Sequence, residues 1–133
     1  LIDAVFKLHV KYRMAHQQIN LQSILLDCFY NTKLADLQYS QAFQKWEPSV
    51  MCHNKLHFRA PETIMGKLHN PYKSDVWSLG ICLYGMLTKG LPFVNCDGLN
   101  KFVQDQMQVG YIEKKINSLS QHKTGKDKFN KGP

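Results

Sequence analysis

No apolar run in this 133-residue chain is long enough to cross a membrane. The longest, residues 76–87, is interrupted by Ser78, Gly80 and Gly85, whereas a membrane-spanning helix needs about 20 predominantly apolar residues. The N-terminus shows no signal peptide. Leu1 falls inside an amphipathic pattern, so we expect the N-terminus to be a cut edge. We therefore expect no membrane partner.

The chain also lacks the cysteine spacing of a metal site. Its four cysteines are far apart with no C-x-x-C pair, and its six histidines are scattered, whereas structural zinc sites pair ligands a few residues apart. We expect free thiols in a reducing compartment, cytoplasmic or otherwise intracellular. Cys82 lies in the apolar run and is expected to be a small core residue.

Acidic residues are scarce: 10 Asp and Glu stand against 17 Lys and Arg, which gives a net charge of +7. Six of the lysines fall within residues 114–131. A basic tail can attract nucleic acid or anionic lipid. Here the lysines are mixed with Asn, Gln, Ser and Gly and with little aromatic content, so residues 113–133 are predicted to be a basic, disordered tail. Nucleic-acid binding is the least favoured function.

Periodicity predicts the elements of the first half of the chain. Residues 1–11 carry apolar side chains at helical spacing and are predicted to form an amphipathic helix. The short apolar runs at residues 24–26 and 33–36 flank a polar and aromatic segment and predict a β-hairpin. Residues 37–58 show no regular pattern and are predicted to be a long loop, a kind of segment that is usually functional or mobile.

A central buried helix is predicted over residues 74–88. Ser74 and Asp75 are candidate N-caps after the turn signal of Asn70 and Pro71. The segment is apolar on nearly every face, so we expect it to be buried on all sides. The residues expected to be inaccessible are Trp77, Leu79, Ile81, Leu83 and Tyr84.

The helix is expected to end at Lys89 and Gly90, since Pro92 prevents its continuation. Asp97 is a candidate cap for a last helix that ends near Gly110. Its apolar stripe comprises Leu99, Phe102, Val103, Gln106 and Met107. The predicted fold class is mainly α with one small β-hairpin, arranged around the central helix.

Four motifs in register resemble the C-terminal lobe of the eukaryotic protein kinase family. Residues 16–27 read H-Q-Q-I-N-L-Q-S-I-L-L-D, similar to the catalytic loop H-R-D-L-K-P-E-N-I-L-L-D, and residues 33–38 read K-L-A-D-L-Q, similar to K-L-x-D-F-G. Residues 60–62 match the A-P-E that ends the activation segment. Residues 74–80, S-D-V-W-S-L-G, resemble the central helix, and with Leu91-Pro92-Phe93 favour the Ser/Thr branch. The resemblance implies a partial kinase-like domain over residues 1–112.

The catalytic loop departs from the family at each position that carries chemistry. Gln18 stands at the position of the catalytic Asp, and an amide is not a usable base near neutral pH. Gln17 replaces the Arg that pairs with a phosphorylated activation segment. Asn20 stands at the position of the Lys that steadies the transferring phosphate, and Ser23 replaces the Asn that binds a second Mg²⁺. The resemblance therefore implies no catalytic residue in this loop.

The nucleotide site is degenerate as well. Asp36 survives at the metal-binding position but is followed by Leu37 and Gln38 in place of Phe and Gly. A lone Asp binds Mg²⁺ poorly, so Asp36 is interpreted as a vestigial ligand whose carboxylate accepts backbone hydrogen bonds at a strand end. Within these 133 residues there is no Gly-rich loop, V-A-I-K lysine or partner Glu. We expect no cofactor; ATP and Mg²⁺ are expected only if the chain is part of an active kinase.

The remaining matches imply structural roles. His16 and Leu37 occupy positions of an apolar column above the central helix, and residues 24–26 lie where the floor of the adenine pocket would be. Asp75 matches the residue that hydrogen-bonds the catalytic-loop backbone. Glu62 normally pairs with an Arg that has no match here. Trp77 belongs to the central helix.

Three functions remain open from the sequence. The leading hypothesis is a pseudokinase-like module that acts in protein binding or scaffolding, with a protein partner such as an active kinase. The second is a fragment of a divergent Ser/Thr protein kinase that transfers phosphate from ATP to protein hydroxyls. The third is a truncated product without a selected function. Gln18 and Ser23 together disfavour the enzyme, because two independent losses must be explained.

Overall fold

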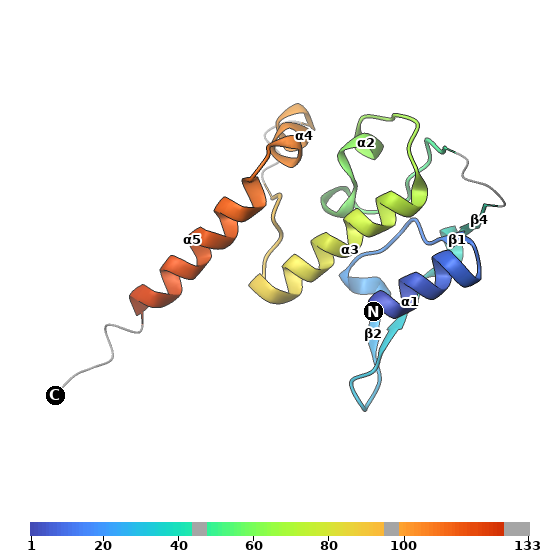
Figure 1. Ribbon diagram of the computed structural model, residues 1–133, viewed down its shortest axis with the longest axis horizontal. Coiled ribbons are helices and arrows are strands. Elements are labelled where there is room, and N and C mark those ends of the chain that lie inside the picture. The colour runs from blue at the N-terminus through green and yellow to red at the C-terminus, as the bar shows by residue number, and fades with distance from the viewer. Residues whose placement is uncertain (44–47, 95–98, 127–133) are drawn as a thin grey trace.

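The computed structural model describes residues 1–43, 48–94 and 99–126. An 18-residue helix, α3 (Pro71–Thr88), runs through the middle of the molecule (Figure 1). Helix α1 (Ile2–Phe6) lies on one side of it and α2 (Pro61–Ile64) and α4 (Leu99–Met107) on the other. The predicted mainly helical fold around a central helix is confirmed.

Two small antiparallel sheets accompany the helices. The predicted hairpin is confirmed as β2 (Ile24–Leu26) paired with β3 (Thr32–Leu34), with Leu25 opposite Lys33. A second pair, β1 (Met14–Ala15) with β4 (Gln41–Ala42), was not predicted. Each of its strands has two residues, which is too short for an alternating pattern to be visible.

Short helical turns fill the connections. The predicted helix at residues 1–11 is α1 continued by a π-helix, Lys7–Lys11. Three 3₁₀ turns follow, at Leu21–Ser23, Leu37–Tyr39 and Leu56–Phe58. Two of them and β4 lie in residues 37–58, so that segment is less irregular than predicted.

The core forms where α3 meets the segments on its inner side. Its buried members come from α1, the loop after β1, the last 3₁₀ turn, α3, the segment after α3, and α4, namely Val5, Ile19, Phe58, Ile81, Cys82, Phe93 and Phe102. Phe93 contacts Phe102 edge-to-face and stacks on both Trp77 and Tyr111. Aromatic contacts therefore join α3 to the two C-terminal helices.

The predicted start of the central helix was wrong. Helix α3 begins three residues earlier, because Asn70 is the N-cap and its side-chain oxygen accepts hydrogen bonds from the amides of Tyr72 and Lys73. Pro71 follows at the first helical position, where its fixed φ suits a helix and its missing N–H costs nothing. Ser74 and Asp75 lie buried inside the helix instead of capping it.

The prediction that this helix is buried on all sides was also wrong. Ile81 and Tyr84 are buried, but Trp77 and Leu79 are only half-buried and Leu83 is 49% exposed. The exposed side also carries Val76, Met86 and Leu87. The physical reason is that the described segments pack against one side of α3 and leave the opposite side in contact with water.

The C-terminal residues differ from the disordered tail that was predicted. Helix α5 (Tyr111–Lys126) covers most of that region and projects from the body (Figure 1). Its first turn is held by the stacking of Tyr111 on Phe93 and by a hydrogen bond from Lys115 Nζ to the Pro92 carbonyl. Ile112, Ile116 and Leu119 recur at spacings of four and three residues, a helical pattern that the abundance of lysines obscured.

Other predictions have mixed outcomes. Helix α4 is present with Phe102, Val103 and Gln106 buried, but Met107 is exposed. Asp97, Cys96 and residues 127–133 lie outside the described residues.

Cys28, Cys52 and Cys82 are free thiols, and burial raises the pKa of Cys82 to about 12. Among the described residues, no helix has the length and apolar character that crossing a membrane requires.

Candidate functional site

The loop that follows β1 occupies the place of a catalytic loop, and one buried carboxylate holds it. Asp75 of α3 is 1% exposed. Its Oδ2 accepts hydrogen bonds from the His16 amide at 2.6 Å and lies 2.9 Å from His9 Nε2, and its Oδ1 accepts from the Gln17 amide at 2.8 Å. Gln17 has a φ of 64°, which is uncommon for a residue other than glycine. The carboxylate thus stabilises a strained loop conformation.

His16 ties this loop to the segment that carries Asp36. Its ring is fully buried, and Nε2 lies 2.8 Å from the Ala35 carbonyl oxygen. A carbonyl can only accept, so Nε2 carries the proton, and Nδ1 is free to accept from the Gln18 amide at 3.3 Å. The histidine therefore positions two backbone segments and has no nitrogen left for proton transfer.

Asn20 and Ser23 are engaged with each other. The backbone N–H of Asn20 donates to Ser23 Oγ at 3.0 Å, and Ser23 Oγ donates to the backbone carbonyl of Asn20 at 2.8 Å. Asn20 Oδ1 accepts from the Gln22 amide, and Asn20 Nδ2 donates to the Gln18 carbonyl. Both residues are buried. The Asn20 and Ser23 side chains form a capping box for the Leu21–Ser23 turn, and both are engaged in hydrogen bonds with the backbone of the loop.

The side chains of Gln18 and Asp36 make few interactions with the rest of the loop. The side-chain oxygen of Gln18 is buried and has no hydrogen-bond partner. Asp36 is exposed with a φ of 63°, at the start of the Leu37–Tyr39 turn, and no side-chain hydrogen bond is made there. Within the part of the chain that the structure describes, the Asp36 carboxylate makes none of the predicted backbone hydrogen bonds. In the described part of the chain, no three His, Cys, Asp or Glu residues gather closely enough to hold a metal ion.

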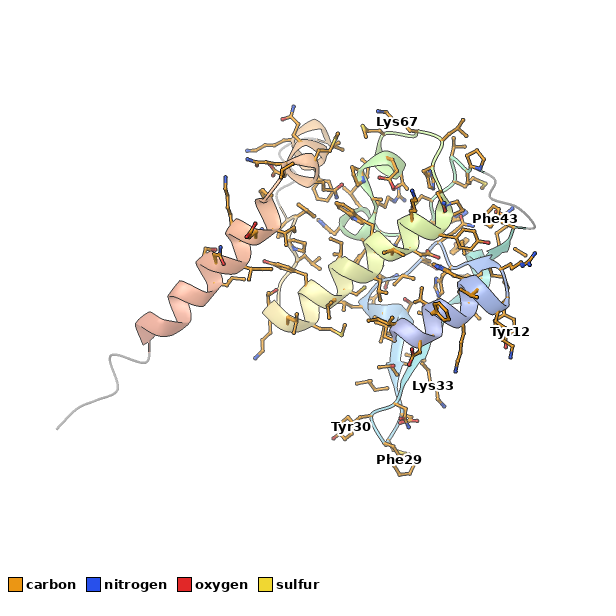
Figure 2. The ribbon with its side chains drawn as sticks, in the orientation of Figure 1. Tyr12, Phe29, Tyr30, Lys33, Phe43 and Lys67 are labelled. Atoms are coloured by element: carbon orange, nitrogen blue, oxygen red, sulfur yellow. The ribbon has the colours of Figure 1, made fainter. Side chains whose placement is uncertain are left out.

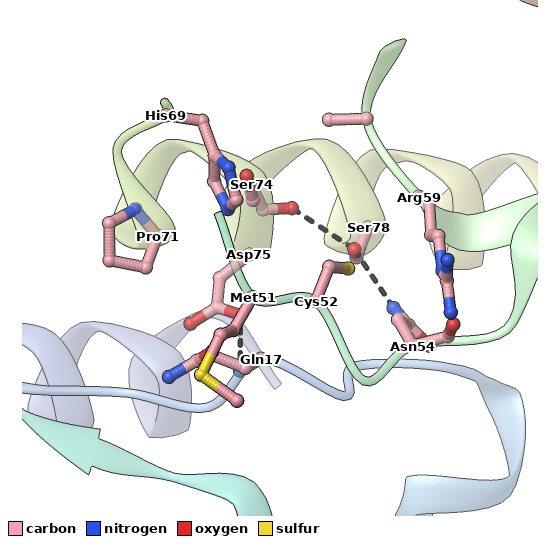
Figure 3. Close-up of a pocket in the computed structure, with 11 residues that line it drawn as sticks. Gln17, Met51, Cys52, Asn54, Arg59, His69, Pro71, Ser74, Asp75 and Ser78 are labelled. Atoms are coloured by element: carbon pink, nitrogen blue, oxygen red, sulfur yellow. Dashed lines mark hydrogen bonds between the residues drawn. The ribbon is translucent and has the colours of Figure 1, made fainter. Parts of the chain in front are cut away.

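A buried network that sequence reasoning missed links the loop to α3. Asn54 Nδ2 donates to the Ile19 carbonyl at 2.6 Å. It also donates to Ser78 Oγ at 3.1 Å (Figure 3). Ser78 Oγ in turn lies within hydrogen-bonding distance of the Phe58 and Ser74 carbonyls. Arg59 Nε donates to the backbone carbonyl of Asn54. Asn54 lies in the stretch without periodicity, so no sequence signal indicated this role.

The space inside this network is too small for a nucleotide. The cavity between Gln17, Met51, Cys52, Ser74 and Asp75 has a volume of about 10 Å³ (Figure 3). That is about the room of one water molecule. The loop, the segment around residue 54 and α3 therefore pack as a closed structural unit.

The surface that the kinase resemblance assigns to an adenine ring is open. Leu37 is 50% exposed, and Leu25 and Leu26 of β2 are also exposed. Leu37 therefore does not pack in an apolar column with His16, contrary to the prediction. All three of these side chains keep about half or more of their surface in contact with water. Exposed apolar walls alone do not orient a nucleotide.

Glu62 and Trp77 lie at a second, larger pocket on the other side of α3. The pocket has a volume of about 490 Å³ and is also lined by Lys73, Tyr84 and Phe93. Among the described residues, no ion pair joins Glu62 to a Lys, Arg or His side chain. Trp77 stacks on Phe93 with 6.1 Å between ring centroids.

Comparison with known proteins gives a consistent result. The family model described as "Protein kinase domain" matches residues 1–131. The chain is 36% identical over 93 residues to a carbon catabolite-derepressing protein kinase of Secale cereale, covering 70% of this chain and 18% of that protein. It is 31% identical over 100 residues to the probable serine/threonine-protein kinase KCC4 of Saccharomyces cerevisiae, covering 75% of this chain and 10% of that protein. Serine/threonine-protein kinase SIK2 of Gallus gallus is 32% identical over 100 residues, with coverages of 75% and 12%. The chain thus spans less than a fifth of the length of each of these relatives.

Proposed function

This chain belongs to the protein kinase family, and from that premise we propose that it is a catalytically impaired, pseudokinase-type module that acts by binding other proteins. It retains the family's central helix and the buried carboxylate that positions the catalytic loop. What it has lost are the groups that would act on ATP and on a substrate hydroxyl.

The observation that carries the proposal is the engagement of Asn20 and Ser23 with each other. Phosphoryl transfer depends on positioned cations and on a base near the attacking hydroxyl. At these two positions the side chains cap a 3₁₀ turn instead. Gln18 adds an amide where a base is needed, and an amide does not accept a proton near neutral pH. Three positions would have to change together before catalysis could return.

The proposed partner is a protein, of which an active kinase is one candidate, inside the cell. The support is the retained kinase-like architecture together with the apolar side chains that it exposes, among them Leu25, Leu26, Leu37 and Leu83. Exposed apolar surface of this kind is typical of protein interfaces. No cofactor is part of the proposal.

The second candidate is a fragment of a divergent Ser/Thr kinase, and one observation favours it. Asp36 keeps an exposed carboxylate on a left-handed backbone, and residues in such sparsely populated conformations cluster at functional sites. Asp36 is therefore the residue whose substitution discriminates the two candidates.

The expected result of an activity assay is no phosphate transfer. With Mg²⁺ and radiolabelled ATP, the purified chain should label generic Ser/Thr protein substrates no more than a mock preparation does, because Gln18 is not a base. An active Ser/Thr kinase serves as the positive control. Transfer that is present in the chain and lost in Asp36→Asn would establish the divergent-kinase alternative instead.

Nucleotide should also fail to stabilise the protein. A ligand at 100 times its dissociation constant adds about 2.7 kcal/mol of stability, so a thermal melt is a sensitive test. We expect the melting temperature to be the same with and without ATP and Mg²⁺. An upward shift that requires Mg²⁺ and disappears in Asp36→Asn would contradict the proposed loss of the nucleotide site.

A further inference from the structure

An apolar groove lies between α1 and the exposed side of α3. It has a volume of about 640 Å³ and is lined by Ile2, Asp3, Val76, Leu79, Leu83 and Met86, among others. Gly80 lies in its wall, and a Cβ added there would meet no atom within 4 Å. The centre of the groove is therefore hollow, and its walls expose large apolar side chains to water.

A pair of exposed aromatic side chains, Phe29 and Tyr30, projects beside this groove and forms an aromatic knob. At the tip of the β2–β3 hairpin, Phe29 is 80% exposed and Tyr30 is 84% exposed (Figure 2). Asp27 organises the turn: its carboxylate accepts hydrogen bonds from the Phe29 amide and from both the amide and the side chain of Asn31. The bonds from Asn31 hold the pKa of Asp27 below its ordinary value. The two aromatic rings are thus displayed on a preorganised turn, which lowers the entropy that binding would cost.

The knob and the groove are neighbours on one face. The amino group of Leu1 donates a hydrogen bond of 2.8 Å to Thr32 Oγ1 on the hairpin, and Leu1 also lines the groove. Thr32 pairs with Leu26 at the end of the ladder nearest the turn, and the N-terminus lies beside the hairpin (Figure 1). A convex and a concave apolar feature side by side make a surface that is complementary to itself after a two-fold rotation.

We propose that two copies of this chain associate about a two-fold axis, with Phe29 and Tyr30 of each copy inserted into the α1–α3 groove of the other. Charge agrees with this arrangement: Asp3 lines the groove and Lys33 lies on the hairpin, both exposed and neither in an ion pair within the described residues. In the dimer, Lys33 of one copy approaches Asp3 of the other. The dimer does not depend on whether the chain is catalytic.

The area that the contact buries suits a stable dimer. Each aromatic side chain buries roughly 150–250 Å². Four of them, together with the groove walls that cover them, reach about 1,200–2,000 Å², the range of specific protein interfaces. The net charge of +7 opposes association, so the measurement is made at about 0.15 M salt, where the Debye length is about 8 Å.

Sedimentation velocity of the full chain tests the proposal. Between about 1 and 200 µM, a range chosen for interfaces of this size, the mass should rise from that of the 15.4 kDa chain to twice that value. The double variant Phe29→Ala with Tyr30→Asn should raise the dissociation constant at least about tenfold, as loss of aromatic anchors does. Asn is chosen because Tyr30 has a φ of 62°. The matched control Tyr12→Ala, an exposed aromatic beyond the π-helix (Figure 2), should not change it.

A charge exchange identifies the interface. Asp3→Lys alone should weaken the dimer, and Asp3→Lys with Lys33→Asp should restore it, because the pair of opposite charges is re-formed across the contact. A chain that stays monomeric over the whole range overturns the proposal. So does a dimer that neither the aromatic double variant nor the charge exchange affects.

Discussion

Replacing Asp75 by Asn is expected to lower the free energy of unfolding by about 3–5 kcal/mol, because two buried backbone amides would lose hydrogen bonds to a charged acceptor, each worth about 1.5–3 kcal/mol. The carboxylate accepts hydrogen bonds from two amides of the catalytic loop and contacts His9. An Asn side chain has one accepting oxygen, so its NH₂ group would face an N–H donor in a buried site almost closed to bulk water. Against a total stability of about 5–15 kcal/mol for a domain, this loss is large.

The matched control is Asp36→Asn, the same chemical change at an exposed carboxylate. Asn tolerates the left-handed backbone at this position, so the cost should be no more than about 0.5 kcal/mol. Urea unfolding followed by circular dichroism measures both variants. Equal costs for the two substitutions would show that Asp75 does not hold the loop in solution.

The second large effect is expected for Ile81→Ala, at about 2–5 kcal/mol, because removing buried methyl groups leaves a cavity. Ile81 is 5% exposed and belongs to the core cluster. Leu83, two residues along the same helix, is 49% exposed. Because Leu83 is only about half-buried, Leu83→Ala removes less buried apolar surface, and we expect it to lower the free energy of unfolding by about 1 kcal/mol.

These two variants measure how one-sided the burial of α3 is. Urea unfolding is carried out at the low end of the concentration range used for sedimentation, so that the chain is monomeric, with Val109→Ala at a 95% exposed position as the neutral control. If Leu83→Ala proves as costly as Ile81→Ala in the monomer, the outer side of α3 is covered in solution and the open groove is wrong.

The strongest sequence signals were those that arise from residues close together in the chain. The apolar run at residues 76–87 predicted the central helix, and two short runs predicted the hairpin, because helical and strand periodicities are local properties. Family motifs identified the loop, since their residue order is itself the signal. Capping was less certain: Asn70, Ser74 and Asp75 are all good caps, and Pro71 favours the first of them.

The sequence by itself determined the kinase-like family, the central helix and the hairpin, and it places an amide, Gln18, at the position that the family resemblance gives to a base. Only the tertiary structure decided which side of α3 is buried, that α5 is helical, and that Asn54 and Ser78 join the catalytic loop to α3. It also decided that Asn20 and Ser23 are occupied by each other. The physical reason is that burial and hydrogen bonding depend on which segments meet in space. Asn54 meets Ile19 across 35 positions of chain, and no local pattern encodes such a contact.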